Sequence, residues 1–268
     1  MRWGLSIPTT TSSEPISVVM VRVDSLMLRT NAGGIIAFAM EAYEKGLLSR
    51  KDTDGIELVW GSGDAMVKMV EKMGRGEGIG KLMAEGSRKM AEALGKNAIE
   101  FAIHVKGLEP SAHDPRRFFS QALSYATAAR GACHLRGTFY KAELAGEVDP
   151  AKVEGKASKQ IDYEDRACLF DSLILCRFFR DFFLWDEIGA LIRGATGLDW
   201  DRTALERFAN GVTLASREYN RREGLGPESD RLPAALLKAN EQGASISAAE
   251  LAYMIDDYNA IRAARAQS

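Results

Sequence analysis

Apolar side chains recur every three or four residues along most of this chain. Between Ile36 and Leu47 they follow such a stripe, and Gly46 stands near its end. This spacing predicts an amphipathic helix that starts close to Asn31. A second stripe of methionines starts at Met66, and Ser62 or Asp64 precedes it at the place where a helix is capped.

Similar stripes predict further helices. Their expected ranges are 80–94, 118–129, 163–190, 201–222 and 248–264. Two short apolar runs, 56–60 and 99–105, could be extended, but they are too few for a substantial sheet. Residues 106–117 hold two prolines and a potential Asx turn, which predicts a loop. The fold class that follows is mainly α.

Proline and polar residues divide the chain. Pro8 and Pro15 make residues 1–22 an irregular segment. We expect a first helical domain over 23–150 and a second over 151–268. The polar stretch "KVEGKASKQID", residues 152–162, is expected to be exposed between helices.

Composition narrows the possible functions. The 268 residues carry a formal net charge of −2, without the basic surface that nucleic acid or a membrane surface would require. No apolar run can span a bilayer, and the N-terminus lacks a signal-peptide core, so the cytoplasm is the expected location. Three cysteines without a CxxC pair argue against a disulfide framework and against a self-contained iron–sulfur motif.

Two nearly identical hexapeptides stand out, "DSLMLR" at 24–29 and "DSLILC" at 171–176. On a continuous helix, Leu169, Leu173 and Cys176 would share one face. A core helix with a buried cysteine is the ordinary interpretation of a single copy. Asp171 is less ordinary, because a carboxylate in an apolar run needs a donor or a cation. The repeat makes a pseudo-symmetric ligand site plausible.

Two glycine-bearing motifs compete as further sites. "ARGACHLRG", residues 129–137, places Cys133, His134 and Arg136 beside two glycines. Histidine moves protons near neutral pH, and arginine binds phosphate through a fork of donors. An ordinary turn is the alternative. "GRGEGIGKLMAEG", residues 74–86, lacks both phosphate-loop signatures, so we interpret it as a turn that leads into a helix.

Six segments occur in the order seen in one enzyme family. They are "GGIIAFAMEAYEKGLL", "GRGEGIGKLMAEG", "HVKGLEPSAHDPR", "LSYATAARGACHLRG", "FDSLILCRFF" and "YNRREGLGPESDRLP". In these segments the chain resembles the aldehyde ferredoxin oxidoreductase family, but only its C-terminal helical domains 2 and 3. The resemblance implies that the N-terminal β-rich pterin domain is absent.

The resemblance implies a tungsten (or molybdenum) ion between two pterins, next to a [4Fe–4S] cluster. Aldehydes would be oxidised to carboxylic acids, and ferredoxin would accept the electrons. His134 matches a histidine near the metal and would carry the proton as the catalytic residue. Arg136 matches a basic residue near the pterin.

The hexapeptides resemble the family's two DxxGL motifs, one for each pterin. By this resemblance Asp171 and Leu175 would bind one pterin, and Asp24 and Leu28 the other. Cys176 would ligate the iron cluster as its metal ligand.

The chain departs from the family pattern in ways that matter. Met27 and Ile174 replace the usual glycine of DxxGL, and a CxxCxxxC triplet that supplies three cluster ligands is missing. One cysteine cannot hold a cubane cluster. We therefore expect the chain alone to be inactive. The expected partners are a separately encoded N-terminal half and a second copy of the chain in a homodimer.

Two alternatives stay open. The chain could be a non-catalytic remnant or helical interaction domain, or a subunit resembling aromatic thioester reductases. If a further domain normally covers it, Met66, Met69, Met73 and the aromatics of "FFRDFFLW", residues 178–185, should be partly exposed.

Overall fold

The computed structural model describes residues 29–137 and 139–267, so Asp24, Met27 and Leu28 of the first hexapeptide lie outside the described residues. Over these ranges the backbone forms helices and loops without a β-strand, and Val105 and Leu108 form an isolated bridge. This confirms the mainly α fold class. In the same ranges, every helix is too short or too polar to cross a membrane.

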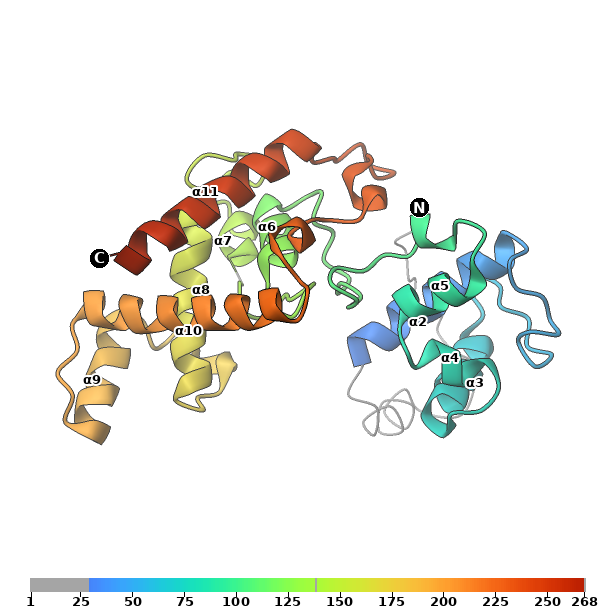
Figure 1. The fold of residues 1–268 in the computed structure, drawn as a ribbon, viewed down its shortest axis with the longest axis horizontal. Coiled ribbons are helices and arrows are strands. Elements are labelled where there is room, and N and C mark those ends of the chain that lie inside the picture. Colours follow the sequence, from blue (N-terminus) through green and yellow to red (C-terminus); the bar gives the residue numbers. More distant parts are fainter. Residues whose placement is uncertain (1–28, 138, 268) are drawn as a thin grey trace. The chain divides into compact units, whose positions relative to one another are not determined.

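The described residues separate into two compact units, and each is considered by itself (Figure 1). The first unit, 29–113 and 232–243, contains α2 (Arg29–Glu44), α3 (Gly63–Arg75), α4 (Ile79–Met83), α5 (Ser87–Leu94) and the 3-10 helices η1 (Ala98–Glu100) and η4 (Ala234–Leu237). The second, 114–231 and 244–267, contains α6 (Phe119–Thr127), α7 (Tyr140–Leu144), α8 (Lys156–Ser172), η2 (Arg177–Phe179), α9 (Trp185–Thr196), α10 (Arg202–Arg222), η3 (Pro227–Ser229) and α11 (Ala248–Gln267).

The core of the first unit forms where the methionine stripe of α3 meets α2, α4 and α5. Met69 and Met73 are buried there, so their expected exposure is wrong, whereas Met66 is partly exposed as expected. The predicted cap is confirmed, because the hydroxyl of Ser62 accepts a hydrogen bond from the backbone N–H of Ala65 at 3.2 Å.

The single helix predicted over 80–94 is two helices. Gly86 has φ of +95°, a conformation that breaks the helix between α4 and α5 and that glycine adopts without a Cβ clash. Glu109 then supplies the missing cap, because its carboxylate accepts the backbone N–H of Ser87 at 2.6 Å. The predicted stop at Gly95 is confirmed.

The polar stretch 152–162 is exposed only in part. Lys156 opens α8 and is buried, and its ammonium pairs with the buried carboxylate of Glu143 from α7. The carbonyl oxygens of Asp149 and Pro150 accept further hydrogen bonds from the same ammonium. The predicted domain boundary at 150/151 therefore lies inside the second unit, where these contacts hold both sides together.

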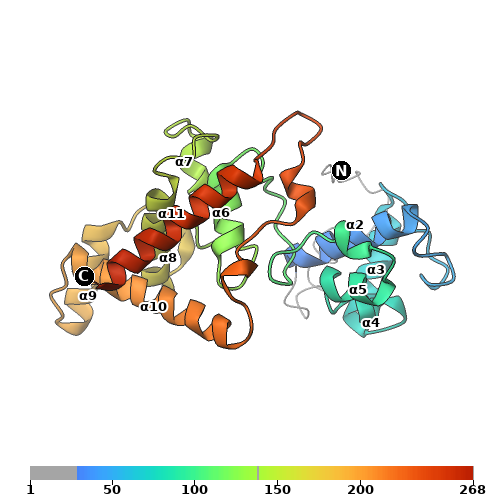
Figure 2. The ribbon, with the colours of Figure 1, turned by 45° about the horizontal axis from the view of Figure 1, so that its top comes forward.

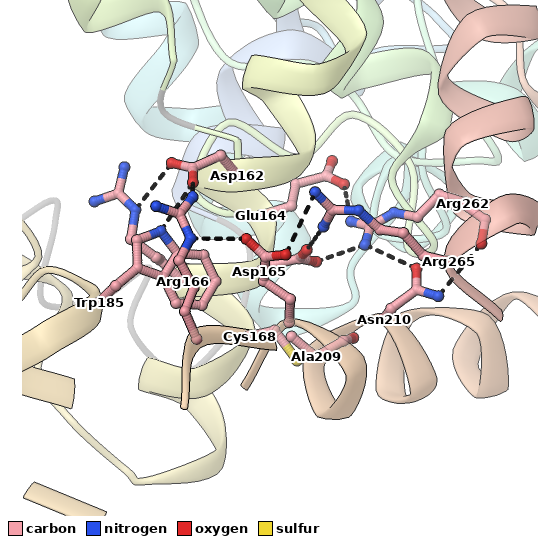
Figure 3. A network of polar contacts seen from close by, with 12 residues as sticks. Asp162, Glu164, Asp165, Arg166, Cys168, Trp185, Ala209, Asn210, Arg262 and Arg265 are labelled. Carbon is pink, nitrogen blue, oxygen red and sulfur yellow. Dashed lines mark hydrogen bonds and ion pairs between the residues drawn. The ribbon is translucent and has the colours of Figure 1, made fainter. Parts of the chain in front are cut away.

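In the second unit, α10 and α11 both cross α8 (Figures 1 and 2). A buried polar network fixes this crossing, with Arg262 of α11 at its centre (Figure 3). The Arg262 guanidinium is 2% exposed and donates to Asp165 at 2.5 Å and to Glu164 at 3.0 Å, both on α8. It also donates to the side-chain oxygen of Asn210 on α10 at 3.1 Å.

Removing this guanidinium should unfold the second unit more readily. We expect Arg262→Met to lower the free energy of unfolding by about 3–5 kcal/mol, because the buried Glu164 loses its cation and Asp165 keeps only Arg265. Chemical denaturation followed by circular dichroism measures the change. The exposed Arg222 on α10 provides the control, since Arg222→Met should cost less than about 1 kcal/mol. Equal effects of the two substitutions would contradict this prediction.

Candidate functional site

The second hexapeptide forms the end of α8. The helix ends at Ser172, and the N–H of Leu175 donates to the carbonyl of Phe170 at 2.9 Å. The N–H of Ile174 donates to the carbonyl of Asp171 at 3.2 Å. These two bonds, with a left-handed residue between them, define a Schellman motif at a helix C-terminus.

This ending corrects the helix predicted over 163–190. Ile174 has φ of +57°, so Leu169, Leu173 and Cys176 do not continue along one helical face. The chain resumes a helix at Trp185, the first residue of α9. The structure also explains why a glycine usually stands at the fourth position of the motif, since the left-handed residue of a Schellman motif falls there.

Asp171 lies in the last turn of α8 and needs positive partners. A carboxylate at a helix C-terminus faces the negative end of the helix dipole. Arg177 donates from Nε to Asp171 Oδ1 at 3.0 Å and from its Nη2 to Oδ2. Arg136 Nε lies 3.4 Å from Oδ2. The carboxylate is therefore held between two guanidinium groups and stays partly exposed.

Arg136 comes from the segment that follows α6, residues 128–137, which we call the α6 loop. Its backbone turns at Gly131 and Ala132, both with positive φ. The Ser124 hydroxyl donates to the carbonyl of Cys133 at 2.9 Å and so anchors the loop to α6. Gly137 touches α8 so closely that an added Cβ would lie 1.7 Å from Gln160 Nε2.

The predicted catalytic histidine, His134, is half-buried in the α6 loop, two residues before Arg136. The structure thus brings Arg136 and Asp171 together and places His134 on the same loop. Leu175 is half-buried against the core that contains Leu169 and Phe170, where it completes the turn. Its predicted contact with a pterin stays a prediction.

The three cysteines differ in exposure. Cys176 is exposed directly after the turn, Cys168 is half-buried in α8, and Cys133 is buried. Burial raises the pKa of the Cys168 thiol, and the nearby Asp165 carboxylate raises it further. Within residues 29–137 and 139–267, no three histidine, cysteine or acidic side chains gather as a metal site. The role of Cys176 as a cluster ligand stays a prediction.

A pocket of about 120 Å³ opens beside the Arg136–Asp171 pair. Its lining includes two guanidinium groups, two carboxylates and a thiol, contributed by Arg136, Arg217, Glu164, Asp171 and Cys168. Hydroxyl groups of α8 and α10 complete it. Such a lining offers both donors and acceptors to a small polar group.

These features define a helical domain in which one helix end and one adjoining loop bring charged side chains together. The chain belongs to the aldehyde ferredoxin oxidoreductase family, because the family model "Aldehyde ferredoxin oxidoreductase, domains 2 & 3" matches residues 15–263. This confirms both the recognised family and the part of it that the chain represents.

Curated relatives support the same assignment. The chain is 34% identical over 222 residues to the tungsten-containing aldehyde ferredoxin oxidoreductase of Pyrococcus furiosus, covering 80% of this chain and 36% of that protein. It is 37% identical over 175 residues to the WOR-like subunit of an aliphatic sulfonate oxidoreductase from the same organism, covering 62% and 25%. The chain thus spans about a third of the length of the relatives it matches.

A solved structure shares the fold. The active-site complex BamBC of benzoyl coenzyme A reductase, in complex with 1,5-dienoyl-CoA, superposes with a TM-score of 0.68. The match covers 87% of this chain and 41% of that chain at 17% identity, which shows the fold alone.

Sequence reasoning missed three residues of this region. Arg177 follows Asp171 by six residues, and the need of Asp171 for a cation was the signal that pointed to it. Arg217 and Asn220 bond to the end of α6 and the α6 loop from α10. The segment "YNRREGLGPESDRLP", which contains Asn220 and follows Arg217 closely, was part of the family resemblance, but its sequence alone indicated no role.

The left-handed turn at Ile174 yields a stability prediction. The side chain is 93% exposed, so its removal loses little burial. A left-handed conformation costs a non-glycine residue about 1–2 kcal/mol, and the freedom of glycine in the unfolded chain offsets about 0.5–1 kcal/mol of that. Ile174→Gly should therefore stabilise the protein by up to about 1.5 kcal/mol in chemical denaturation. Ile174→Ala, which keeps a Cβ, should gain less; equal gains would argue against strain.

The cysteines should differ in reactivity. We expect a thiol reagent at neutral pH to modify Cys176 first, Cys168 more slowly and Cys133 only when the protein unfolds. Mass spectrometry of peptides after timed alkylation measures the order. Cys176→Ser should remove the fast phase, and a persisting fast phase would contradict the exposed position of this thiol.

Proposed function

We propose that this chain forms the helical, cofactor-facing part of a tungsten- or molybdenum-pterin oxidoreductase that converts aldehydes to carboxylic acids and passes electrons to ferredoxin. The observation that carries the proposal is the meeting of Asp171 and Arg136 at the left-handed end of α8, directly before the exposed Cys176. Because the chain belongs to this family, we interpret these residues as groups that face the cofactor and the cluster.

The donor set suits a pterin. A pterin ring presents adjacent N–H groups, and a carboxylate accepts such a fork in two parallel bonds. Asp171 accepts a fork of this kind from Arg177 through both oxygens, and each oxygen has a further lone pair that a ligand can use. The bound cofactor would supply the two-electron chemistry of the reaction.

The remaining roles fall to side chains of this chain. Asp171 would orient the cofactor ring, and the Arg136 guanidinium would balance negative charge beside it. An imidazole nitrogen of His134 would hold or release the proton that aldehyde oxidation sets free. Cys176 would contribute one thiolate to an iron–sulfur cluster, and the other ligands would come from the part of the enzyme that this chain does not match.

The competing proposal is a helical domain that folds without binding a cofactor. Ile174 favours it, because a β-branched residue occupies the left-handed position of the motif. The two proposals differ in whether Asp171 and Cys176 still support metal binding.

A chimera separates the two proposals. Residues 15–263 would replace the matching third of the Pyrococcus furiosus relative. We expect the chimera to hold tungsten and iron by elemental analysis and to reduce a viologen dye when an aldehyde is added. Asp171→Asn should lower the tungsten retained after dialysis about tenfold or more, because charged hydrogen bonds to the cofactor are lost.

Asp181→Asn is the matched control, since Asp181 is an exposed carboxylate that pairs with Lys141. It should leave the tungsten content unchanged. Cys176→Ser should lower the iron content. If neither Asp171→Asn nor Cys176→Ser changes the tungsten and iron contents, the result would support a domain that binds no cofactor.

A further inference from the structure

The segment "YNRREGLGPESDRLP" carries the family resemblance, yet the proposed function gives it no role. In the structure its first residues end α10, which passes beside the end of α6. Two side chains of α10 reach across. Arg217 Nη1 donates to the carbonyl oxygen of Thr127 at 3.0 Å, and the Asn220 side-chain amide donates to that of Ala129 at 2.5 Å.

The first of these carbonyls belongs to Thr127, the last residue of α6, and the second to Ala129 in the α6 loop. The last carbonyl groups of α6 cannot bond within the helix. Thr127 is 2% exposed, so water reaches this part of the chain poorly. Arg217 therefore supplies a bond that the end of α6 requires, and a cation at a helix C-terminus also favours the helix dipole. Asn220 supplies a second bond two residues further on, at the start of the loop.

Arg217 is itself held in place. Its Nη2 donates to Asp230 Oδ2 at 2.6 Å and to Asn259 Oδ1 at 3.0 Å. Asp230 is buried and belongs to the same resemblance segment. Since the guanidinium has partners on α11 and on the segment after α10, its position is fixed independently of the carbonyl it supports.

We propose that Arg217 and Asn220 are positioning residues, which fix the start of the α6 loop and thereby place Arg136 against Asp171. The loop begins at Ala128, directly between the two supported carbonyls, and reaches Arg136 after the turn at Gly131 and Ala132. Because Asp171 ends α8 on another element, the 3.4 Å separation between the two side chains depends on where the loop starts. The value of this placement for catalysis rests on the proposed function.

The test removes one donor without changing the shape of the side chain. Asn220→Asp keeps the volume but has no N–H to donate. By hydrogen–deuterium exchange of the whole chain, we expect backbone amides of residues 131–137 to exchange about fivefold faster or more. Asn220→Ala should act in the same way, so a folding failure of either variant still leaves a measurement.

A spectroscopic readout distinguishes positioning from general loosening. The chain has three histidines, and His134 belongs to the α6 loop, whereas His104 and His113 belong to the first unit. The imidazole C–H signal of His134 should shift in both Asn220 variants, and the other two should stay in place. Arg217→Lys should act like them, because an ammonium cannot reproduce the fork of donors.

Arg222→Ala is the matched control. This arginine lies on the same turn of α10 but pairs with Glu218 in solvent, so the exchange of residues 131–137 should not change. Unchanged exchange in the Asn220 variants, or equally faster exchange throughout the second unit, would overturn the proposal. No cofactor enters this test, so its failure is separate from a chimera that fails to bind tungsten.

Discussion

The buried guanidinium of Arg262 is the interaction on which the second unit depends. It joins α11 to two carboxylates of α8 and to an amide of α10, and the three helices cross where it lies (Figure 3). The elements that carry the candidate site are held in place by this crossing. Asp171 ends α8, and the two α10 side chains that support the α6 loop lie beyond Asn210 on the same helix. The crossing of α8, α10 and α11 thus fixes the position of Asp171 directly and that of Arg136 through the α6 loop.

Burying a charge between helices costs desolvation free energy, and hydrogen bonds to the neighbouring side chains offset this cost. Burial and the Glu164 carboxylate raise the pKa of Tyr258, so the phenol stays protonated and donates to Glu164 at 2.7 Å. Arg265 donates to the second oxygen of Asp165 at 2.7 Å. Because each buried carboxylate has more than one donor, neither is left unsatisfied. Such a network tolerates only one register of α11 on α8.

The sequence predicts the parts of the fold that local chemistry decides. Ser62 caps α3 and Asp201 caps α10, and both helices appear where stripes and caps agree. The break after α8 escaped prediction because Ile174 stands where a glycine would have signalled it, and the apolar run that follows suggests more helix. The sequence predicts an exposed segment at Lys156 because its partner, Glu143, lies 13 residues earlier and no periodic pattern connects them.

The candidate site shows the same division. Only the family resemblance could join Arg136 to Asp171, because no local pattern relates positions on the α6 loop and on α8. The expected exposure of the aromatics is confirmed for part of the run: Phe178 and Phe182 are 86% and 73% exposed, whereas Trp185 is buried. Contiguous exposed apolar side chains are typical of surfaces that contact another protein.

Cys176 lies at the start of that exposed run, and this position bears on the cluster that it is proposed to share. A thiolate inside the helical core could not meet ligands from elsewhere, whereas an exposed one beside apolar surface can. The relatives are about three times as long as the region they share with this chain. The single cysteine proposed to bind the cluster thus lies next to the exposed apolar side chains of Phe178 and Phe182. A partner that supplies the remaining ligands would at the same time bury Phe178 and Phe182.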